Sequence, residues 1–109
     1  MERSKQIEEC IQHCIKCFQG CTEGIPHCLD KGGKHAEPSH IKLMMETADM
    51  CNINASFLLQ EAKHAKEHCK LCATVCEDCS EACGSFSDDS KMKMMSENLK
   101  KCADSCRNM

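Results

Sequence analysis

Cysteines spaced three and four residues apart constrain this chain more than any other feature of its sequence. Of the 13 cysteines in 109 residues, eleven fall into three runs: Cys10-Cys14-Cys17-Cys21, Cys69-Cys72-Cys76-Cys79-Cys83 and Cys102-Cys106. Because an α-helix turns once every 3.6 residues, side chains at these steps lie on one face of a helix. The spacing therefore predicts helices that each carry a stripe of sulfur.

The cysteines must also supply much of the hydrophobic core. Ile, Leu, Val and Phe together number 16, and the chain has three Phe, no Trp and no Tyr. These 16 residues are about 15% of the chain, which is less than the roughly 20% below which highly charged chains are disordered. Since the net charge is only −3, we expect a folded single domain over residues 1–109 with sulfur in its interior.

Helical patterning dominates, and no useful stretch alternates apolar and polar residues as a strand does. Pro26 predicts a kink in the first helix, Gly32-Gly33 a break after it, and the polar stretch 60–64 a turn between the second and third helices. We expect helices at roughly 4–29, 39–60, 62–84 and 88–107. Four helices with short links predict an all-α fold, an antiparallel up-down four-helix bundle with a cysteine-lined core.

Several functional classes are disfavoured by charge and composition. A net charge of −3 and a pI of about 6.0 provide no basic face for nucleic acid. No run of about eighteen apolar residues could form a membrane span, and the first residues lack a secretory signal, so we expect a cytoplasmic protein. No activated nucleophile, paired carboxylates or phosphate loop is evident, so we expect no enzyme activity.

The cysteine spacing suits metal binding better than disulfide formation. Helical residues three or four apart have Cβ atoms about 5–6 Å apart, whereas a disulfide needs Cβ atoms about 3.5–4.5 Å apart. A metal ion spans the wider gap, because each metal–sulfur bond adds roughly 2.3 Å. Cytoplasmic thiols also stay reduced. We therefore predict that the cysteines bind metal as free thiolates.

Copper(I) is the metal that such a core favours. Thiolates are soft ligands for Cu(I), Zn(II) and iron–sulfur clusters. Equal numbers of thiolates and Cu(I) ions are nearly neutral, whereas zinc with four thiolates leaves about two negative charges per buried site. A zinc or other soft-metal buffer and a thiol redox sensor remain alternatives. The predicted ligands of multiple Cu(I) ions are Cys10, Cys14, Cys17, Cys21, Cys28, Cys51, Cys69, Cys72, Cys76, Cys79, Cys83, Cys102 and Cys106.

Softer, neutral ligands gather at one end of the predicted bundle. An up-down topology brings His40, Met44, Met92 and Met95 together with Cys28. These imidazole and thioether groups are candidates for the place where copper enters, although methionine also serves as a filler of irregular cores. At the other end, His64 and His68 flank the second turn, and we expect both in solvent.

The three cysteine runs resemble those of the small bacterial cysteine-rich four-helix-bundle copper storage proteins, in their leader-less cytosolic branch. The resemblance covers nearly the whole chain. It implies an interior filled by Cu(I) bridged between thiolate pairs, a homotetramer, and a role in copper storage or detoxification. This sequence departs from the family pattern at Met44, Met92, Met95 and Leu99, where further cysteines are expected, and that implies a lower loading. Neither the copper donor nor the acceptor is identified by the sequence.

Overall fold

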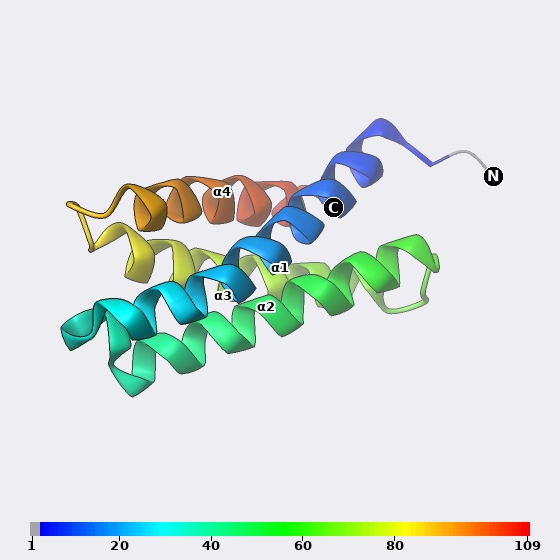
Figure 1. Cartoon of the computed structure of the whole chain (residues 1–109). Coiled ribbons are helices and arrows are strands. Elements are labelled where there is room, and N and C mark those ends of the chain that lie inside the picture. Colours follow the sequence, from blue (N-terminus) through cyan, green and yellow to red (C-terminus); the bar gives the residue numbers. More distant parts are fainter. Residues whose placement is uncertain (1–2) are drawn as a thin grey trace.

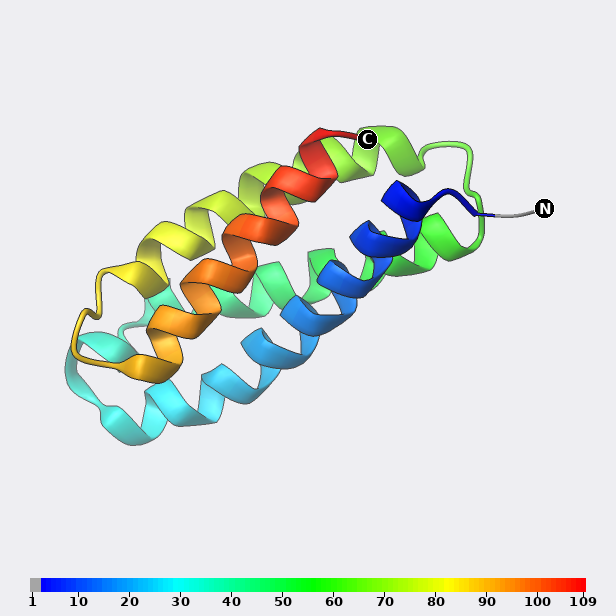
Figure 2. The same ribbon diagram turned by 90° about the horizontal axis from the view of Figure 1, so that it is seen from above.

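The computed structural model of the chain describes residues 3–109 and consists of four long helices joined by short links (Figure 1). These are α1 (Lys5–Lys31), α2 (Pro38–Leu59), α3 (Ala65–Gly84) and α4 (Ser90–Arg107), with a short 3₁₀ helix, η1 (Gly33–Ala36), between α1 and α2. Successive helices run in opposite directions, and each packs lengthwise against two others (Figure 2). The resulting rod measures 48 × 20 × 18 Å. The predicted all-α antiparallel four-helix bundle is confirmed.

Local chemistry sets where the helices begin. The Ser4 hydroxyl caps α1 by accepting from the Ile7 backbone N–H at 3.1 Å. Pro38 stands at the start of α2, where its missing N–H leaves no helical hydrogen bond unmade. The Asp89 carboxylate caps α4 by accepting from the backbone N–H groups of Lys91 and Met92. These side chains satisfy backbone donors that the first helical turn leaves free.

Three helix boundaries differ from the sequence-based expectation by two residues or more: the end of α1, the start of α3, and the start of α4, which is Ser90 rather than 88. α1 continues through Pro26 and ends at Lys31, where Gly32 takes a left-handed φ of 71° and donates its N–H to Cys28 O. Pro26 is exposed, so water can satisfy the backbone carbonyl that proline leaves without a donor. α3 begins at Ala65 rather than 62, because the turn at residues 60–64 includes Glu61 at φ 54°. The 3₁₀ helix η1 was not predicted.

The connections between the helices lie at the two ends of the rod (Figure 2). η1 and the link from α3 to α4 lie at one end, which we call the η1 end (residues 27–40 and 83–92). The α2–α3 turn and both ends of the described chain lie at the other, which we call the terminal end (residues 3–10, 58–69 and 106–109).

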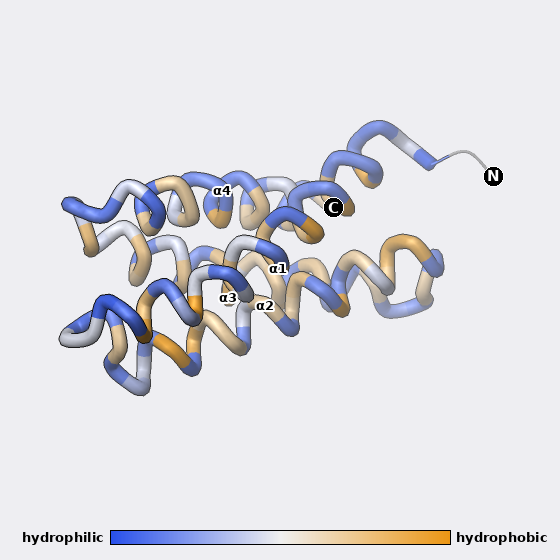
Figure 3. The backbone as a smooth tube through the Cα atoms, viewed as in Figure 1, coloured by the Kyte–Doolittle hydropathy of each residue, from blue (hydrophilic) through white to orange (hydrophobic). Residues whose placement is uncertain are grey.

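Cysteine dominates the buried core. Among residues 3–109, 24 apolar residues are buried and 13 of them are cysteines; the largest fully buried apolar side chains are Ile11, Met44, Met92 and Leu99. Along each helix, hydrophilic and hydrophobic segments alternate (Figure 3). None of the helices within residues 3–109 has the apolar length that crossing a membrane requires.

Replacing Leu99 with Ala should destabilise the bundle, because Leu99 is only 1% exposed and its removal leaves a cavity. We expect the free energy of unfolding to fall by about 2–5 kcal/mol in urea titrations under reducing conditions, followed by helical circular dichroism. The control is Met94→Ala on the same helix, which removes a side chain that is 63% exposed. Its expected effect is within about 0.5 kcal/mol. Equal losses in the two variants would contradict the assignment of Leu99 to the core.

Candidate metal centre

The thirteen cysteine side chains converge on the axis of the bundle, and we call this set the sulfur column. None is more than 3% exposed, and all are free thiols. Every long helix contributes: five cysteines come from α1, one from α2, five from α3 and two from α4. The stripes predicted on separate helices therefore face one another across a dry interior.

Sulfur atoms from different helices lie at distances that a metal ion could bridge. Sγ–Sγ separations are 3.6 Å for Cys10–Cys106, 3.8 Å for Cys14–Cys102 and 3.5 Å for Cys51–Cys76. Two metal–sulfur bonds of roughly 2.3 Å each can span such gaps. Two groups have all three sulfur atoms within 4.8 Å of one another: Cys10, Cys14 and Cys106, and Cys51, Cys76 and Cys102.

One buried amide enters the sulfur column from α2. Asn54 has no exposed surface, and its Nδ2 donates to Cys14 Sγ at 3.3 Å and to Cys106 Sγ at 3.6 Å. Its Oδ1 accepts from His68 Nδ1 at 2.8 Å, which fixes the orientation of the amide. The sequence analysis missed Asn54, although its position three residues after Cys51 is a usable signal. The expectation that His68 is solvated was wrong, because the ring is half-buried against Phe57, whereas His64 is exposed as expected.

Neighbouring thiols control one another's protonation. Hydrogen bonds from Cys21 and Cys83 lower the pKa of Cys79, whereas the hydrogen bond to Cys79, followed by burial, raises the pKa of Cys21 and of Cys83. At the η1 end, burial and the negative charges of Asp89 and Cys79 raise the pKa of Cys28. Three of these four thiols therefore keep their protons at neutral pH, so metal binding must displace them.

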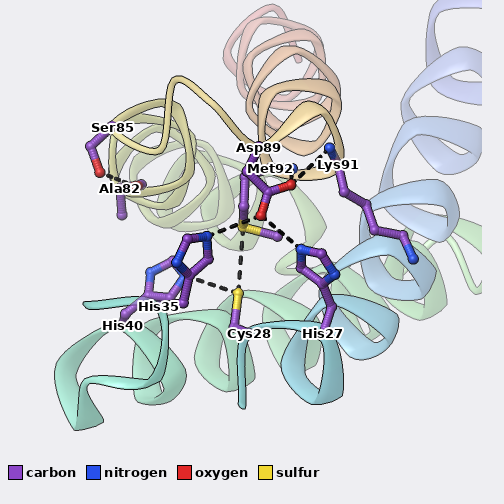
Figure 4. A network of polar contacts seen from close by, with 9 residues as sticks. All are labelled: His27, Cys28, His35, His40, Ala82, Ser85, Asp89, Lys91 and Met92. Carbon is purple, nitrogen blue, oxygen red and sulfur yellow. Dashed lines mark hydrogen bonds and ion pairs between the residues drawn. The ribbon is translucent and has the colours of Figure 1, made fainter. Parts of the chain in front are cut away.

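The η1 end brings three kinds of soft ligand together (Figure 4). Cys28 Sγ lies 3.5 Å from His40 Nε2 and donates to Met92 Sδ, also at 3.5 Å. Burial lowers the pKa of His40, so its imidazole is neutral at pH 7 and can act as a metal ligand. Thiol, imidazole and thioether groups thus meet around one sulfur atom at the tip of the column.

Met44 and Met95 meet one helical turn further inside, beside Gly24 of α1. A Cβ atom at Gly24 would lie 2.6 Å from Met44 Cε and 2.8 Å from Met95 Sδ, so only glycine leaves room for both side chains. Met44 is completely buried, and Met95 is 7% exposed. The four residues singled out as the place of copper entry therefore occupy two adjacent levels of the bundle.

A carboxylate holds the outer histidines of the η1 end in place. Asp89 Oδ2 lies 2.8 Å from His27 Nε2 and 3.0 Å from His35 Nε2, and His35 stacks on Phe86. Burial alone would raise the pKa of Asp89, but hydrogen bonds from His27, the Met92 backbone and His35 outweigh it and lower the pKa. The sequence analysis missed the pairing of Asp89 with His27 and His35, because it joins α4 to α1 and η1 through tertiary contacts.

Comparison with known proteins agrees with this geometry. The family described as copper storage protein, Csp, matches residues 3–109. An uncharacterized cysteine-rich protein, YhjQ, of Bacillus subtilis strain 168 is 32% identical over 102 residues, which are 94% of each chain.

Solved structures share the fold along nearly the whole chain. The Nmul_A1745 protein from Nitrosospira multiformis has a TM-score of 0.89 at 30% identity, covering 95% of this chain and 94% of that one. The Cu(I)-bound copper storage protein BsCsp3 has a TM-score of 0.89 at 31% identity, covering 96% and 98%. Apo-Csp3 from Bacillus subtilis has a TM-score of 0.83 at 32% identity, covering 93% and 95%.

Asp89→Asn should destabilise the η1 end in a pH-dependent manner. Asparagine still caps α4 but lacks the charge that holds His27 and His35, so we expect a loss of about 1.5–3 kcal/mol in unfolding free energy at pH 6. Because folding lowers the pKa of Asp89 from 3.8, its contribution is complete above that value and is lost as pH falls below it. Urea titrations at pH 6 and pH 3 measure the difference.

The matched control for this prediction is Asp88→Asn, which alters the exposed neighbouring carboxylate. It should leave the unfolding free energy nearly unchanged at both pH values. If Asp89→Asn lowers the unfolding free energy by the same amount at pH 6 and at pH 3, the assigned charge interaction is contradicted.

Proposed function

The chain belongs to the copper storage protein family, and we propose that it stores many Cu(I) ions on the thiolates of its interior. The observation that carries this proposal is the sulfur column itself, in which thirteen free thiols from four helices are withdrawn from solvent. Buried sulfur pairs 3.5–3.9 Å apart suit low-coordinate soft ions bridged between thiolates.

The charge of the interior favours Cu(I) over zinc. Among residues 3–109, the buried polar side chains are His40, Thr47, Asn54, Ser80 and Asp89. None of these is a lysine or arginine that could offset the two negative charges of a zinc tetrathiolate. Cu(I) and thiolate in equal numbers need no such compensation. This interior can therefore hold many monovalent Cu(I) ions without additional positive charge.

The proposed storage ligands are the thirteen cysteines of the sulfur column, and copper is proposed to enter at the η1 end. His40 and Met92 each supply one neutral ligand atom 3.5 Å from Cys28 Sγ. Met44 and Met95 provide thioethers at the next level. Neutral ligands bind Cu(I) without proton loss and more loosely than thiolates, which suits transfer inward.

The wider setting follows from the same chemistry. We assign a storage or detoxification role without catalysis, in the cytoplasm of a bacterium, where free thiols remain reduced. We also assign a homotetramer, which is supported by large apolar side chains left exposed on all four helices: Ile15, Leu29, Met45, Ile53, Leu59, Leu71 and Met94. Association of identical chains would cover part of this surface.

Anaerobic titration with Cu(I) tests storage directly. We expect copper–thiolate absorption to rise until about ten or more ions are bound per chain, approaching about one Cu(I) per thiolate. The absence of Trp and Tyr leaves the ultraviolet region clear for this measurement. The control is a zinc titration, for which tetrathiolate binding predicts saturation near about three ions.

A plateau at one or two Cu(I) ions would contradict storage. Tight zinc binding together with such a plateau would support the zinc alternative. Rapid formation of a few reversible disulfides under mild oxidant, with little copper bound, would support the redox sensor instead.

Met92→Leu should slow copper exchange at the η1 end while keeping the volume of the side chain. We expect removal of Cu(I) by excess chelator to slow about tenfold, because the thioether ligand next to Cys28 is lost, which corresponds to about 1.4 kcal/mol in activation free energy. The control is Met94→Leu, whose side chain is 63% exposed on the same helix. Unchanged rates in Met92→Leu would leave Met92 as a packing residue only.

A further inference from the structure

A cavity adjoins the sulfur column at the terminal end, opposite the η1 end. This cavity of about 360 Å³ is formed where the start of α1, the α2–α3 turn and the segment after α4 meet. We call it the terminal cavity. Its volume is within the range of small-molecule sites in proteins. None of the residues proposed for copper entry lines it.

One lining residue of the terminal cavity belongs to the sulfur column. Cys69 lines the cavity, and its thiol neighbours those of Cys10 and Cys106, two members of the sulfur group at this end of the column. Cys10 Sγ and Cys106 Sγ are 3.6 Å apart. A metal ion placed on Cys69 is therefore one ligand exchange away from the interior.

A thioether lines the same cavity as Cys69. Met109 lines the terminal cavity and packs against the core, and its backbone N–H donates to Cys106 O. Cys69 itself has no exposed surface. Side chains that line the cavity must therefore move before the Cys69 thiol meets a molecule bound there, and the Met109 thioether is a soft group that could bind Cu(I) on the way.

The outer wall of the terminal cavity is positively charged. Arg3, Lys63 and Lys66 line it, whereas Glu61 is the one acidic lining residue within the part of the chain that the structure describes. Arg3 is paired with Glu8, so the two lysines provide most of the free positive charge. This contrasts with the net charge of −3 for the whole chain and with the buried carboxylate of Asp89 at the η1 end. Such a wall repels a bare Cu(I) cation and attracts an anion.

Apolar groups complete the lining. Ile7, Leu58, Ala62 and Ala65 line the cavity together with the charged residues and Cys69. The cavity is therefore suited to a small molecule that has an aliphatic body, carboxylates at its edge and a soft atom facing inward. Because the proposed cargo prefers thiolate sulfur, the soft atom that would bring it is a thiolate.

We propose that the terminal cavity binds an anionic low-molecular-weight thiol carrying Cu(I), and that the copper passes from its sulfur to Cys69. The proposal rests on the function proposed above. In the transfer, the bond between copper and the carrier sulfur breaks as the bond between copper and Cys69 Sγ forms. The Cys69 thiol proton moves to the carrier sulfur, which leaves as a free thiol, and copper remains Cu(I) throughout.

Charge reversal of the cavity wall tests this transfer. Anaerobic loading is followed from two sources, the anionic Cu(I)–glutathione complex and the cationic Cu(I)–acetonitrile complex. In the Lys63→Glu/Lys66→Glu double variant, we expect loading from glutathione to slow by about tenfold. Loading from acetonitrile should not slow, and the final capacity should stay the same. The matched control is Lys100→Glu/Lys101→Glu, which makes the same charge change at exposed positions of α4 outside the cavity.

Binding without metal transfer provides a second, independent readout. S-methylglutathione has the same carboxylates as glutathione but a blocked sulfur, so it is used as the probe with the apo protein. We expect saturable NMR shift changes at the Met109 methyl group and at the backbone amides of residues 61–69. These changes should be lost in Lys63→Glu/Lys66→Glu and kept in Lys100→Glu/Lys101→Glu.

The outcomes separate this inference from the proposed function. Full loading from both sources with the same rates in all three proteins, or no shift changes with S-methylglutathione, would overturn the terminal site and leave storage intact. Equal slowing by the two double variants would also overturn it, because the effect would then follow net charge rather than the cavity. Failure of the wild-type protein to load from acetonitrile would overturn storage itself and this inference with it.

Discussion

The packing of thiols against thiols is the interaction on which the rest of this structure depends. Cysteines make up 13 of the 24 buried apolar residues, so the same sulfur atoms that exclude water also form the candidate ligand set. A buried thiol behaves as a small apolar group while it is protonated. The interior can therefore pack as a core without metal and still provide thiolate ligands when metal displaces the protons. Small domains that fold only around zinc differ in this respect, because they have no such core without the metal.

The two ends of the sulfur column differ in the chemistry that they offer to an incoming ion. At the η1 end, neutral imidazole and thioether groups surround Cys28, and Asp89 fixes the outer histidines. At the terminal end, lysines and aliphatic side chains line the same cavity as Cys69. An ion held by weak neutral ligands suits the first end, whereas an ion carried within an anionic complex suits the second.

The sequence predicted those parts of the structure that depend on periodicity. Cys72 and Cys76 share a helical face by spacing alone, so the bundle and its sulfur-lined interior could be inferred before any coordinates. The contact of Asn54 with Cys14, the burial of His68 and the capture of His35 by Asp89 could not, because each joins residues from different elements whose relative rotation is set by packing. Whether all thirteen cysteines bind copper remains a prediction.

Anomalous diffraction from crystals loaded with Cu(I) under anaerobic conditions, recorded on either side of the copper absorption edge, tests the central claim most directly. Our account predicts a row of copper peaks inside the bundle, each beside cysteine sulfur, from the level of Cys10 to that of Cys28. Copper found only on the outer surface of the helices, or an interior in which the sulfurs have paired as disulfides, would contradict it.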